Sequence, residues 1–431
     1  MINTDVTVIG GGAAGLMAAI TAARCGARAV IIEHMDRVGK KILSTGNGKC
    51  NYTNALQGVS YYRGEDPAFV LPVFAQFGFE ETVSFFEELG IYPKVRNGYY
   101  YPASEQAASV LDVLRMECDY QKVRTYTSCN LKSIKKRENG YQISTDKDAF
   151  LTKSVIFATG LLAAPKTGSD GSAFPYIERL GHHFIDIVPA LVQLQGKQSF
   201  FKSLAGIRAE STINLYIEKD KKSANSSKKS SDHSQNVLTY QETGELQLTE
   251  YGISGIPIFQ LSRFATRALQ EKRQVYALID FMPKLADAEL FALVQKRFKE
   301  YAHGKTANEA LIGLFNKKLI DVLLKESEIN LHQPADELTN KQIQRLCQKI
   351  KQFRVDVIGS KGVDVAQVCA GGVDTSEINA DTLESKIAEG VYFAGEVLDI
   401  DGTCGGYNLQ WAWSSGYVAG VHAAGKGIHR S

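Results

Sequence analysis

The chain begins with the stretch DVTVIGGGAAG at residues 5–15, which decides the fold that we expect. Residues 5–9 are typical of a strand buried on both faces, and residues 16–25 are alanine-rich, as expected for a helix. Residues 29–32 supply a second strand, which ends at Glu33. Glycines with GxGxxG spacing between a strand and a helix, followed by an acid after the next strand, predict a Rossmann-like dinucleotide-binding unit.

Each glycine of this motif has a predicted task. Gly10 permits the tight turn, Gly12 lets the backbone approach a pyrophosphate, and Gly15 lets the helix pack closely on the strand. The start of the helix offers free N–H groups and a partial positive charge to the diphosphate. The carboxylate of Glu33 can accept hydrogen bonds from ribose hydroxyls, and it would repel the 2′-phosphate of an NADP-type ligand.

Three further segments that contain glycine indicate the same ligand. Residues 39–54 (GKKILSTGNGKCNYTN) are polar and directly follow the second strand, where backbone N–H groups and hydroxyls can line a phosphate and a polar ring edge. A predicted buried strand at 154–158 ends at Thr159 and Gly160. Gly371 and Gly372 would let the backbone approach a ring closely.

The C-terminal part of the chain supplies a second acid and a second helix start. An apolar strand at 390–395 delivers Glu396 at its carboxyl end, where ligands of open α/β sheets bind. Gly405-Gly406 then opens a helix predicted at 407–425, whose N-terminus can face a developing negative charge. The alternative is a purely structural helix that carries Trp411 and Trp413.

The middle of the chain predicts an insertion into an α/β domain. Helices are expected at 67–89 and 105–117, and strands at 123–136 and 141–145. Short strands at 190–194, 211–217, 237–240 and 275–280 predict a small antiparallel sheet, and residues 286–301, 308–326 and 339–352 predict helices. The Ser- and Lys-rich residues 219–235 predict a surface loop. We therefore expect a discontinuous Rossmann-like cofactor domain at 1–188 and 356–431, an inserted antiparallel β domain at 189–284 and a small helical subdomain at 285–355.

The composition limits the class of protein. The 431 residues are 44% hydrophobic and 22% charged, as in ordinary globular proteins. Lys and Arg number 49 against 47 Asp and Glu, and this near-neutral balance, without a basic, aromatic-rich stripe, argues against nucleic acid as a partner. Seven scattered cysteines without a CxxC pair predict a cytoplasmic protein without disulfides or a metal site. Residues 6–23 carry no charge, but their glycines favour a buried strand and helix over a membrane span.

Together these motifs resemble the two-dinucleotide-binding-domain flavoproteins. More narrowly, they are similar to the bacterial FAD-dependent family that includes aminoacetone oxidase and a proposed 3-dehydro-bile acid reductase. The resemblance covers essentially the whole chain and is most specific in GEVLDIDGTCGGYNLQWAWSSGYVAG at 395–420. It also includes ATGLLAAPKTGSDG at 158–171 and LTEYGISGIPIFQLS at 248–262. Two departures are Leu161, where the family has a further glycine, and the additional residue Ser169 in TGSDG.

The resemblance implies an FAD site built from both ends of the chain. The residues that it implies are Ala14, Glu33, Lys41, Thr45, Asn47, Cys50, Asn51, Thr159, Glu396, Asp401, Asn408 and Leu409. The predicted cofactor contacts further include Gly10, Gly12, Ala13, Gly15, His34, Gly46, Leu131, Gly160 and Gly372.

A flavin would carry the redox chemistry, and the protein would orient the reactants. The first interpretation is an oxidoreductase for a small organic molecule, in which reduced FAD passes a hydride to an enone-type C=C bond of a steroid or bile-acid-like substrate. NADH or NADPH would be a transient donor, because no second GxGxxG follows a strand. One alternative is an amine oxidase of the aminoacetone type that produces H2O2, and another is a flavoprotein that acts on or binds RNA.

No catalytic residue is assigned from the sequence. Tyr407 or another tyrosine is a candidate proton donor. Cys369 and Cys404 are expected to pack rather than react, and His182 and His183 are expected to be surface or capping residues at a helix end. We expect no membrane partner, and the oligomeric state is open.

Overall fold

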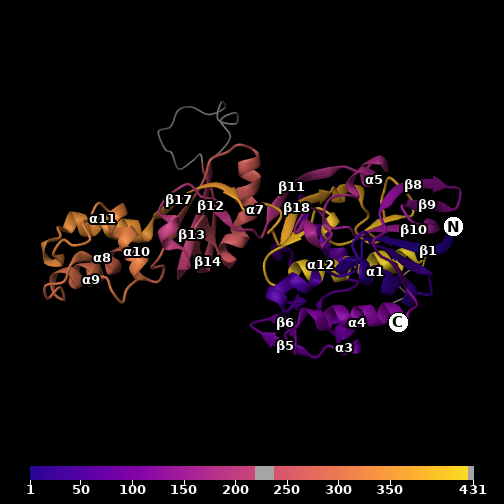
Figure 1. Ribbon diagram of the computed structural model, residues 1–431, viewed down its shortest axis with the longest axis horizontal. Helices are drawn as coiled ribbons and strands as arrows, with labels where there is room; N and C mark the ends of the chain where they lie inside the picture. The colour runs from indigo at the N-terminus through magenta and orange to yellow at the C-terminus, as the bar shows by residue number, and fades with distance from the viewer. Residues whose placement is uncertain (219–236, 426–431) are drawn as a thin grey trace. The chain divides into compact units, whose positions relative to one another are not determined.

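The computed structural model describes residues 1–218 and 237–425 (Figure 1). The loop predicted at 219–235 lies outside the described residues. Contacts divide the chain into two compact units, one made of Met1–Pro189 with Val363–Ser431 and the other of Ala190–Gly362. The first unit therefore contains both ends of the sequence.

A large sheet forms the centre of the first unit. Its strands lie in the order β7-β2-β1-β10-β9-β8, and β19 pairs with β10. The strands β7, β2, β1, β10 and β19 are parallel, whereas β9 and β8 are antiparallel. The strands are β1 (Ile2–Ile9), β2 (Ala29–Ile32), β7 (Arg124–Tyr126), β8 (Leu131–Arg137), β9 (Gly140–Thr145), β10 (Ala149–Phe157) and β19 (Val391–Phe393). This is the expected Rossmann-like sheet, and β19 brings the C-terminal segment into it.

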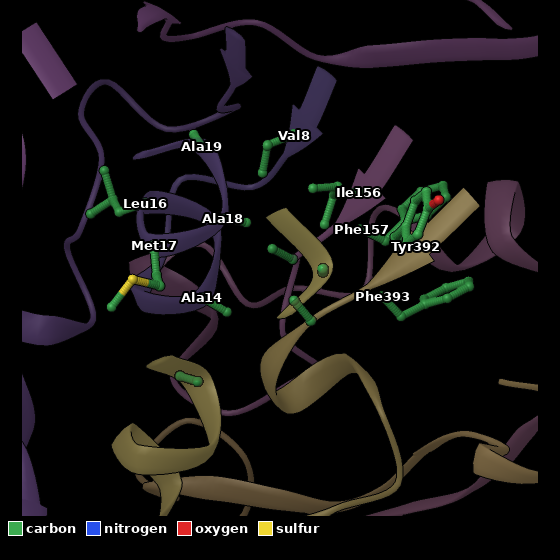
Figure 2. Packing of buried hydrophobic residues seen from close by; sticks show 14 of the residues in the cluster. Val8, Ala14, Leu16, Met17, Ala18, Ala19, Ile156, Phe157, Tyr392 and Phe393 are labelled. Atoms are coloured by element: carbon green, nitrogen blue, oxygen red, sulfur yellow. The ribbon is translucent and has the colours of Figure 1, made fainter. Parts of the chain in front are cut away.

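Helices from the two ends of the chain pack directly against each other in the first unit. They are α1 (Ala13–Arg24) and α12 (Tyr407–Ala423). A Cβ on Gly416 would lie 2.5 Å from the carbonyl oxygen of Ala14, and one on Gly420 would lie 2.5 Å from that of Ala18. Glycine is therefore required at both positions of α12. Figure 2 shows part of the core around α1, in which Val8, Leu16, Ile156 and Phe393 are buried.

Shorter elements complete the first unit. The helices are α2 (Val70–Phe74), α3 (Phe79–Glu88), α4 (Ala107–Tyr120), α5 (Phe174–Arg179) and the 3-10 segments η1 (Ile42–Gly48), η2 (Val59–Tyr61), η3 (Pro67–Phe69), η4 (Pro165–Thr167), η8 (Thr375–Glu377) and η9 (Gly395–Val397). Three small sheets pair β3 (Thr53–Asn54), β6 (Tyr99–Pro102) and β5 (Pro93–Arg96); β20 (Asp401–Gly402) and β4 (Tyr62–Arg63); and β11 (Phe184–Ala190) and β18 (Val368–Val373).

Two predicted elements of the first unit are divided in the structure. The single helix expected at 67–89 is broken before α3, because Gly78 has an extended backbone at φ −102° and ψ −152°. The single strand expected at 123–136 is separated into β7 and β8, and Ser128 between them is left-handed at φ +48°. Both breaks depend on local backbone conformation that the hydrophobic pattern does not reveal.

In the second unit, the expected antiparallel strands form a closed barrel. Its strands pair in the order β12-β15-β14-β13-β16-β17. They are β12 (Leu194–Gly196), β13 (Arg208–Glu218), β14 (Val237–Thr249), β15 (Gly252–Ser254), β16 (Val275–Asp280) and β17 (Phe353–Ser360). The strand expected at 190–194 is wrong, because β11 ends at Ala190, Leu191 is left-handed at φ +49°, and β12 begins only at Leu194.

Helices accompany the barrel within the second unit, and Figure 1 shows α8 to α11 gathered beside it. They are α6 (Phe201–Leu204), α7 (Ile256–Gln270), α8 (Asp287–Lys299), α9 (Ala307–Ala310), α10 (Lys317–Glu326), the 3-10 segment η7 (Ala335–Glu337) and α11 (Asn340–Lys351). The helix expected at 308–326 is divided into α9 and α10. Since β17 belongs to the barrel, contacts group residues 356–362 with the second unit. The division into three parts with boundaries at 188, 284 and 355 stays a prediction.

Candidate functional site

The glycine motif leaves open space at the start of α1. Gly12 is the N-cap residue of α1, and no side chain caps the helix there. A Cβ on Gly12 would meet nothing within 4 Å, whereas a Cβ on Gly15 would lie 1.9 Å from the carbonyl oxygen of Gly10. Gly15 is thus needed for helix packing, and Gly12 leaves room for a group beside the free N–H donors. An anionic diphosphate fits this position.

Glu33 is a buried carboxylate held by backbone donors. Its Oε2 accepts a hydrogen bond of 2.8 Å from Gly11 N, and its Oε1 accepts one of 2.8 Å from Met35 N. Burial raises the pKa of Glu33, but the hydrogen bonds from His34, Met35 and Gly11 outweigh burial and leave that pKa below its ordinary value. The side chain is therefore an ionised acceptor that is already oriented by the motif itself.

His34 connects this acid to the segment that departs from the family pattern. Its Nδ1 lies 3.2 Å from Glu33 Oε1, and its Nε2 lies 3.4 Å from Asp170 Oδ2. The hydrogen bond to Glu33 raises the pKa of His34 against the effect of burial. The additional residue Ser169 is buried, and a Cβ on Gly160 would lie 2.6 Å from its Oγ. The departure thus lies beside two predicted cofactor residues, Gly160 and His34.

The segment at 39–54 is held in an unusual backbone conformation. Gly46, Asn47, Gly48 and Cys50 all have positive φ angles, and Thr45 interrupts η1 with an extended conformation. Asn51 is buried, and among the described residues its Oδ1 has no hydrogen-bond partner. A buried polar atom without a partner is costly, so a ligand N–H or O–H facing Asn51 would relieve that cost.

Glu396 joins distant segments of the first unit at one point. Its Oε2 lies 2.7 Å from Lys41 Nζ, and its Oε1 accepts a hydrogen bond of 2.8 Å from Cys369 N. A Cβ on Gly160 would lie 3.4 Å from Glu396 Oε2. The structure therefore brings together Lys41, Gly160 and Glu396, three residues predicted separately from the sequence.

The start of α12 faces the segment at 39–54. A Cβ on Gly406 would lie 2.8 Å from the carbonyl group of Thr53 and 3.0 Å from Asn51 Oδ1. Asn408 holds the preceding turn through hydrogen bonds of 2.8 Å to both backbone groups of Gly402. The unpartnered oxygen of Asn51 thus lies beside the positive end of a long helix, where a polar and electron-rich ring edge fits.

Gln410 is a buried residue that the sequence analysis missed. Its Nε2 donates to Thr82 Oγ1 and Ser414 Oγ, each at 2.8 Å, and to Gly78 O at 3.1 Å. Its Oε1 accepts a short hydrogen bond from Thr53 Oγ1. Gln410 therefore fixes the first turn of α12 against the segment at 39–54. Its place one residue after Leu409, inside the most specific motif, was the only available signal.

The two tryptophans of α12 have structural contacts. Trp411 Nε1 donates to Gly395 O at 3.1 Å, and Trp413 Nε1 donates to Tyr52 O at 2.9 Å. Both side chains are fully buried. The helix therefore packs along its buried length and has a free N-terminus. A structural role for α12 and a role of its N-terminus beside a negative charge are thus compatible.

The contacts of Leu131, Cys50 and Cys369 are structural. Leu131 starts β8, and its carbonyl oxygen accepts a hydrogen bond of 2.8 Å from the Tyr176 hydroxyl. Burial raises the pKa of the Cys50 and Cys369 thiols to about 12, which keeps both thiols protonated at neutral pH. Cys369 is thus a packed backbone donor to Glu396 rather than a reactive thiolate, as expected.

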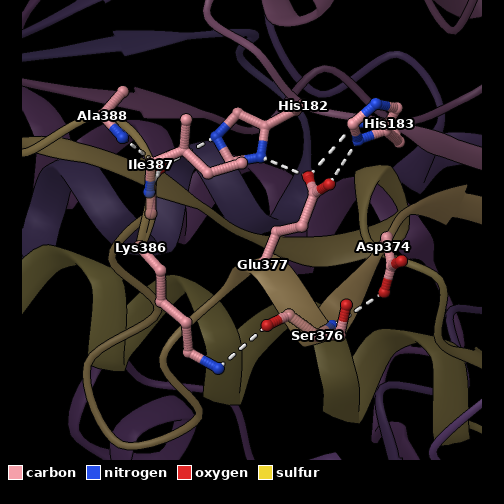
Figure 3. A network of polar contacts seen from close by, with 9 residues as sticks. His182, His183, Asp374, Ser376, Glu377, Lys386, Ile387 and Ala388 are labelled. Carbon is pink, nitrogen blue, oxygen red and sulfur yellow. Dashed lines mark hydrogen bonds and ion pairs between the residues drawn. The ribbon is translucent and has the colours of Figure 1, made fainter.

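A separate polar network surrounds Glu377 (Figure 3). His182 is buried, with Nδ1 2.9 Å from Glu377 Oε2 and Nε2 2.8 Å from Ser385 Oγ. His183 is exposed and contacts Glu377 Oε1 at 2.5 Å. The expectation of a surface or capping residue is wrong for His182. Ser385 Oγ also accepts hydrogen bonds from the backbone N–H groups of Ile387 and Ala388. The network therefore has a structural role, because it holds the backbone around Ser385 against His182.

Residues 4–422 match the family described as "HI0933-like protein Rossmann domain". The chain belongs to this family. It is 43% identical over 424 residues to a 3-dehydro-bile acid delta(4,6)-reductase of Clostridium scindens, and the match covers 97% of this chain and 98% of that protein. It is also 27% identical to a ribosomal RNA dihydrouridine synthase of Haemophilus influenzae, over 96% of this chain and 97% of the relative. The corresponding synthase of Escherichia coli is 26% identical, with 97% of each chain covered.

These matches confirm the predicted family, its Rossmann-like fold and the assignment of the chain as an oxidoreductase. In the residues that the structure describes, no helix has both the length and the apolar character needed to cross a bilayer.

Proposed function

We propose that this protein uses bound FAD to reduce a C=C bond conjugated to a carbonyl group, with NADH or NADPH as the electron donor. The observation that carries the proposal is the 43% identity, over almost the whole length of both proteins, to a relative whose name describes a reduction of this type. When bound, FAD supplies the hydride. The remaining tasks fall to residues of this chain, which bind the cofactor, orient the substrate and provide a proton.

The arrangement of the site supports a specific orientation for FAD. Gly12 and the N-terminus of α1 would hold the diphosphate, and Glu33, fixed by Gly11 and Met35, would accept from the ribose hydroxyls. The Lys41–Glu396 pair would hold the chain between the diphosphate and the ring. Asn51 and the start of α12 would contact the polar edge of the ring, where a partial positive charge favours the reduced, anionic form.

For the first substrate class, a steroid or bile-acid-like enone, a proton donor is needed beside the hydride acceptor. Tyr407 begins α12, and its ring stacks on Tyr61 with centroids 4.5 Å apart. Tyr62 packs edge-on against Tyr407 at 5.9 Å. Burial raises the pKa of Tyr407, so its hydroxyl stays protonated at neutral pH and can act as a donor rather than as a base.

A second substrate class is the uracil ring of RNA, which also contains a C=C bond conjugated to a carbonyl group. Two relatives that match 96–97% of this chain are named as ribosomal RNA dihydrouridine synthases. Both substrates would require the same hydride and proton transfer, so the cofactor site does not distinguish the two substrate classes. The surface that receives the substrate would distinguish them.

Anaerobic stopped-flow measurements test the proposal. The purified holoenzyme should be yellow, should be bleached by NADH or NADPH, and should regain its colour when a 3-oxo-4,6-diene steroid or protein-free ribosomal RNA is added. Reoxidation by the steroid supports the first class, and conversion of uridine to dihydrouridine, detected by mass spectrometry of nucleosides, supports the second. Bleaching by amines, with H2O2 formed on re-aeration, would contradict the proposal in favour of an amine oxidase.

A further inference from the structure

The near-neutral charge of the chain conceals two units of opposite charge. Residues 190–362 contain 26 Lys and Arg against 19 Asp and Glu, a net charge of +7. The residues of the other unit, 1–189 and 363–431, contain 23 against 28, a net charge of −5. A near-neutral whole-chain charge therefore does not exclude RNA as a partner, because the inserted unit by itself is basic.

One basic described stretch of this unit is KRFKEYAHGK at 296–305, which includes the end of α8. Lys296 Nζ lies 5.1 Å from the centre of the Tyr301 ring, and Lys305 Nζ donates to Tyr301 O at 3.2 Å. Lys299 Nζ donates to Asp336 O. Within the described residues, no ion pair joins these three lysines to a carboxylate. These three lysines thus lie outside the salt bridges of the described residues, although Glu300 and Glu309 are close enough to interact with Lys296 and Lys305. Tyr301 remains 49% exposed.

A second group of cations lies at the start of α10. Lys317 and Lys318 are exposed and occupy the first turn, directly after the N-cap residue Asn316. Cations at a helix N-terminus are repelled by the helix dipole, so this arrangement costs stability unless an anion is nearby. Arg297 links this group to α8, because its Nη1 donates to Ala310 O at 3.1 Å and Ile312 O at 3.2 Å, in the segment that leads into α10.

We propose that two basic groups of this unit, Lys296, Lys299, Tyr301 and Lys305 at the end of α8 and Lys317 and Lys318 at the start of α10, bind the backbone of a single-stranded RNA segment. The inference rests on the RNA class of the proposed function. Lysines outside salt bridges around an exposed aromatic ring suit a strand whose phosphates pair with the cations and whose bases stack on the ring. A membrane surface fits less well, since Leu290, Val294 and Phe298, the apolar face of α8, are buried inside the unit and cannot insert into lipid.

The test measures RNA binding directly and does not depend on turnover. Fluorescence anisotropy of the holoenzyme with a labelled oligouridine of about 16 nucleotides gives Kd as a function of salt. The triple variant Lys296→Glu, Lys299→Glu, Lys305→Glu should bind at least about tenfold more weakly, and the slope of log Kd against log salt should fall by about 0.7 for each phosphate that no longer pairs with a lysine. The matched control reverses Lys132, Lys135 and Lys136, which are exposed on β8 of the acidic unit, and should bind like wild type.

A second variant separates binding from folding. Lys317→Glu with Lys318→Glu places acids at the positive end of α10, so it should raise the melting temperature while it weakens RNA binding. Wild type that does not bind the RNA at low salt, a control that is weakened as much as the triple variant, or binding to phosphatidylserine vesicles without binding to RNA would each overturn the inference. Flavin content and reduction by NADPH, measured on the same samples, test the proposed function independently, because an enzyme that reduces the steroid without binding RNA would retain that function.

Discussion

The ammonium group of Lys41 lies 2.7 Å from the carboxylate of Glu396, although 355 positions separate the two residues in sequence. Lys41 follows the first βαβ unit, and Glu396 follows β19, the strand that the C-terminal segment adds to the same sheet. The ion pair therefore joins the two chain segments of the proposed cofactor site, at the point where the chain leaves the sheet and returns. The ion pair forms only when the N-terminal segment with Lys41 and the C-terminal segment with Glu396 are both present.

Replacing Lys41 by methionine should weaken FAD binding without unfolding the protein. Among the described residues, the carboxylate of Glu396 would keep only the Cys369 N–H as a partner, and removing a charged hydrogen bond of this kind costs about 1.5–3 kcal/mol. FAD Kd, measured by flavin fluorescence on apoprotein, should rise about 10-fold or more. Lys40→Met is the control, since Lys40 pairs with the exposed Asp36, and it should leave Kd unchanged. Equal effects of the two variants would contradict this role of Lys41.

Gly12 and Gly15 should respond differently to alanine. At Gly12 a Cβ meets nothing within 4 Å and φ is −78°, so the apoprotein should keep its stability while the methyl group occupies the space proposed for the diphosphate. At Gly15 a Cβ would lie 1.9 Å from Gly10 O, and overpacking of this kind costs about 1–3 kcal/mol or more. Thermal unfolding of the apoproteins and FAD titration separate the two effects. A Gly12→Ala variant that binds FAD normally would show that the diphosphate lies elsewhere.

Glu33→Gln should lower FAD retention and remove a pH dependence. Gln offers one acceptor oxygen where Glu33 accepts from both Gly11 N and Met35 N, so one buried N–H is left without a partner at a cost of about 1–3 kcal/mol. The folded-state pKa of Glu33 lies below its ordinary value of about 4.3, so its contribution is present above that value and is lost as the pH falls through the folded-state pKa. FAD release followed by fluorescence from pH 6 down to about 3 should show this loss in wild type and a flatter profile in the variant. Cys404→Ala should retain FAD better than Glu33→Ala.

The parts of the fold that follow from local chemistry were predictable. The glycine spacing and the acid after the second strand identify the Rossmann-like unit, and β2 lies where the apolar run predicts it, at Ala29–Ile32. The barrel was not predictable as a closed structure, because its closure pairs β12 with β17 across more than 150 residues of sequence. The break at Gly78 and the strand wrongly expected at 190–194 depend on single backbone conformations, which hydrophobic periodicity does not report.

In the candidate site, the sequence identified residues but not their partners. Glu396 was expected to be an acceptor at a strand end, yet its contacts with Lys41 and Cys369 depend on tertiary structure. Gln410 was missed because a buried glutamine that bonds four groups looks like any polar helix residue until its neighbours are known. Charge shows a similar limit. The net charge of +2 is a sum over the whole chain, and it conceals a basic unit whose boundaries are known only from the contacts in the structure.

The His182–Glu377 network should make stability depend on pH. Burial lowers the pKa of His182 against the effect of Glu377, so the folded state favours the neutral ring, and its stability is lost as the pH falls below the ordinary value of about 6.5. The lowered pKa of Glu377 adds a second loss near and below about 4.3, whereas the raised pKa of the exposed His183 acts in the opposite direction. Urea unfolding of wild type and His182→Gln at several pH values between about 5 and 8 should show a smaller loss of stability on acidification in the variant. His183→Gln is the control, and removing its opposing contribution should leave the loss at least as large as in wild type. A loss that stays the same in His182→Gln would contradict this role of His182 and point to another group, such as His422, whose pKa is also lowered by burial.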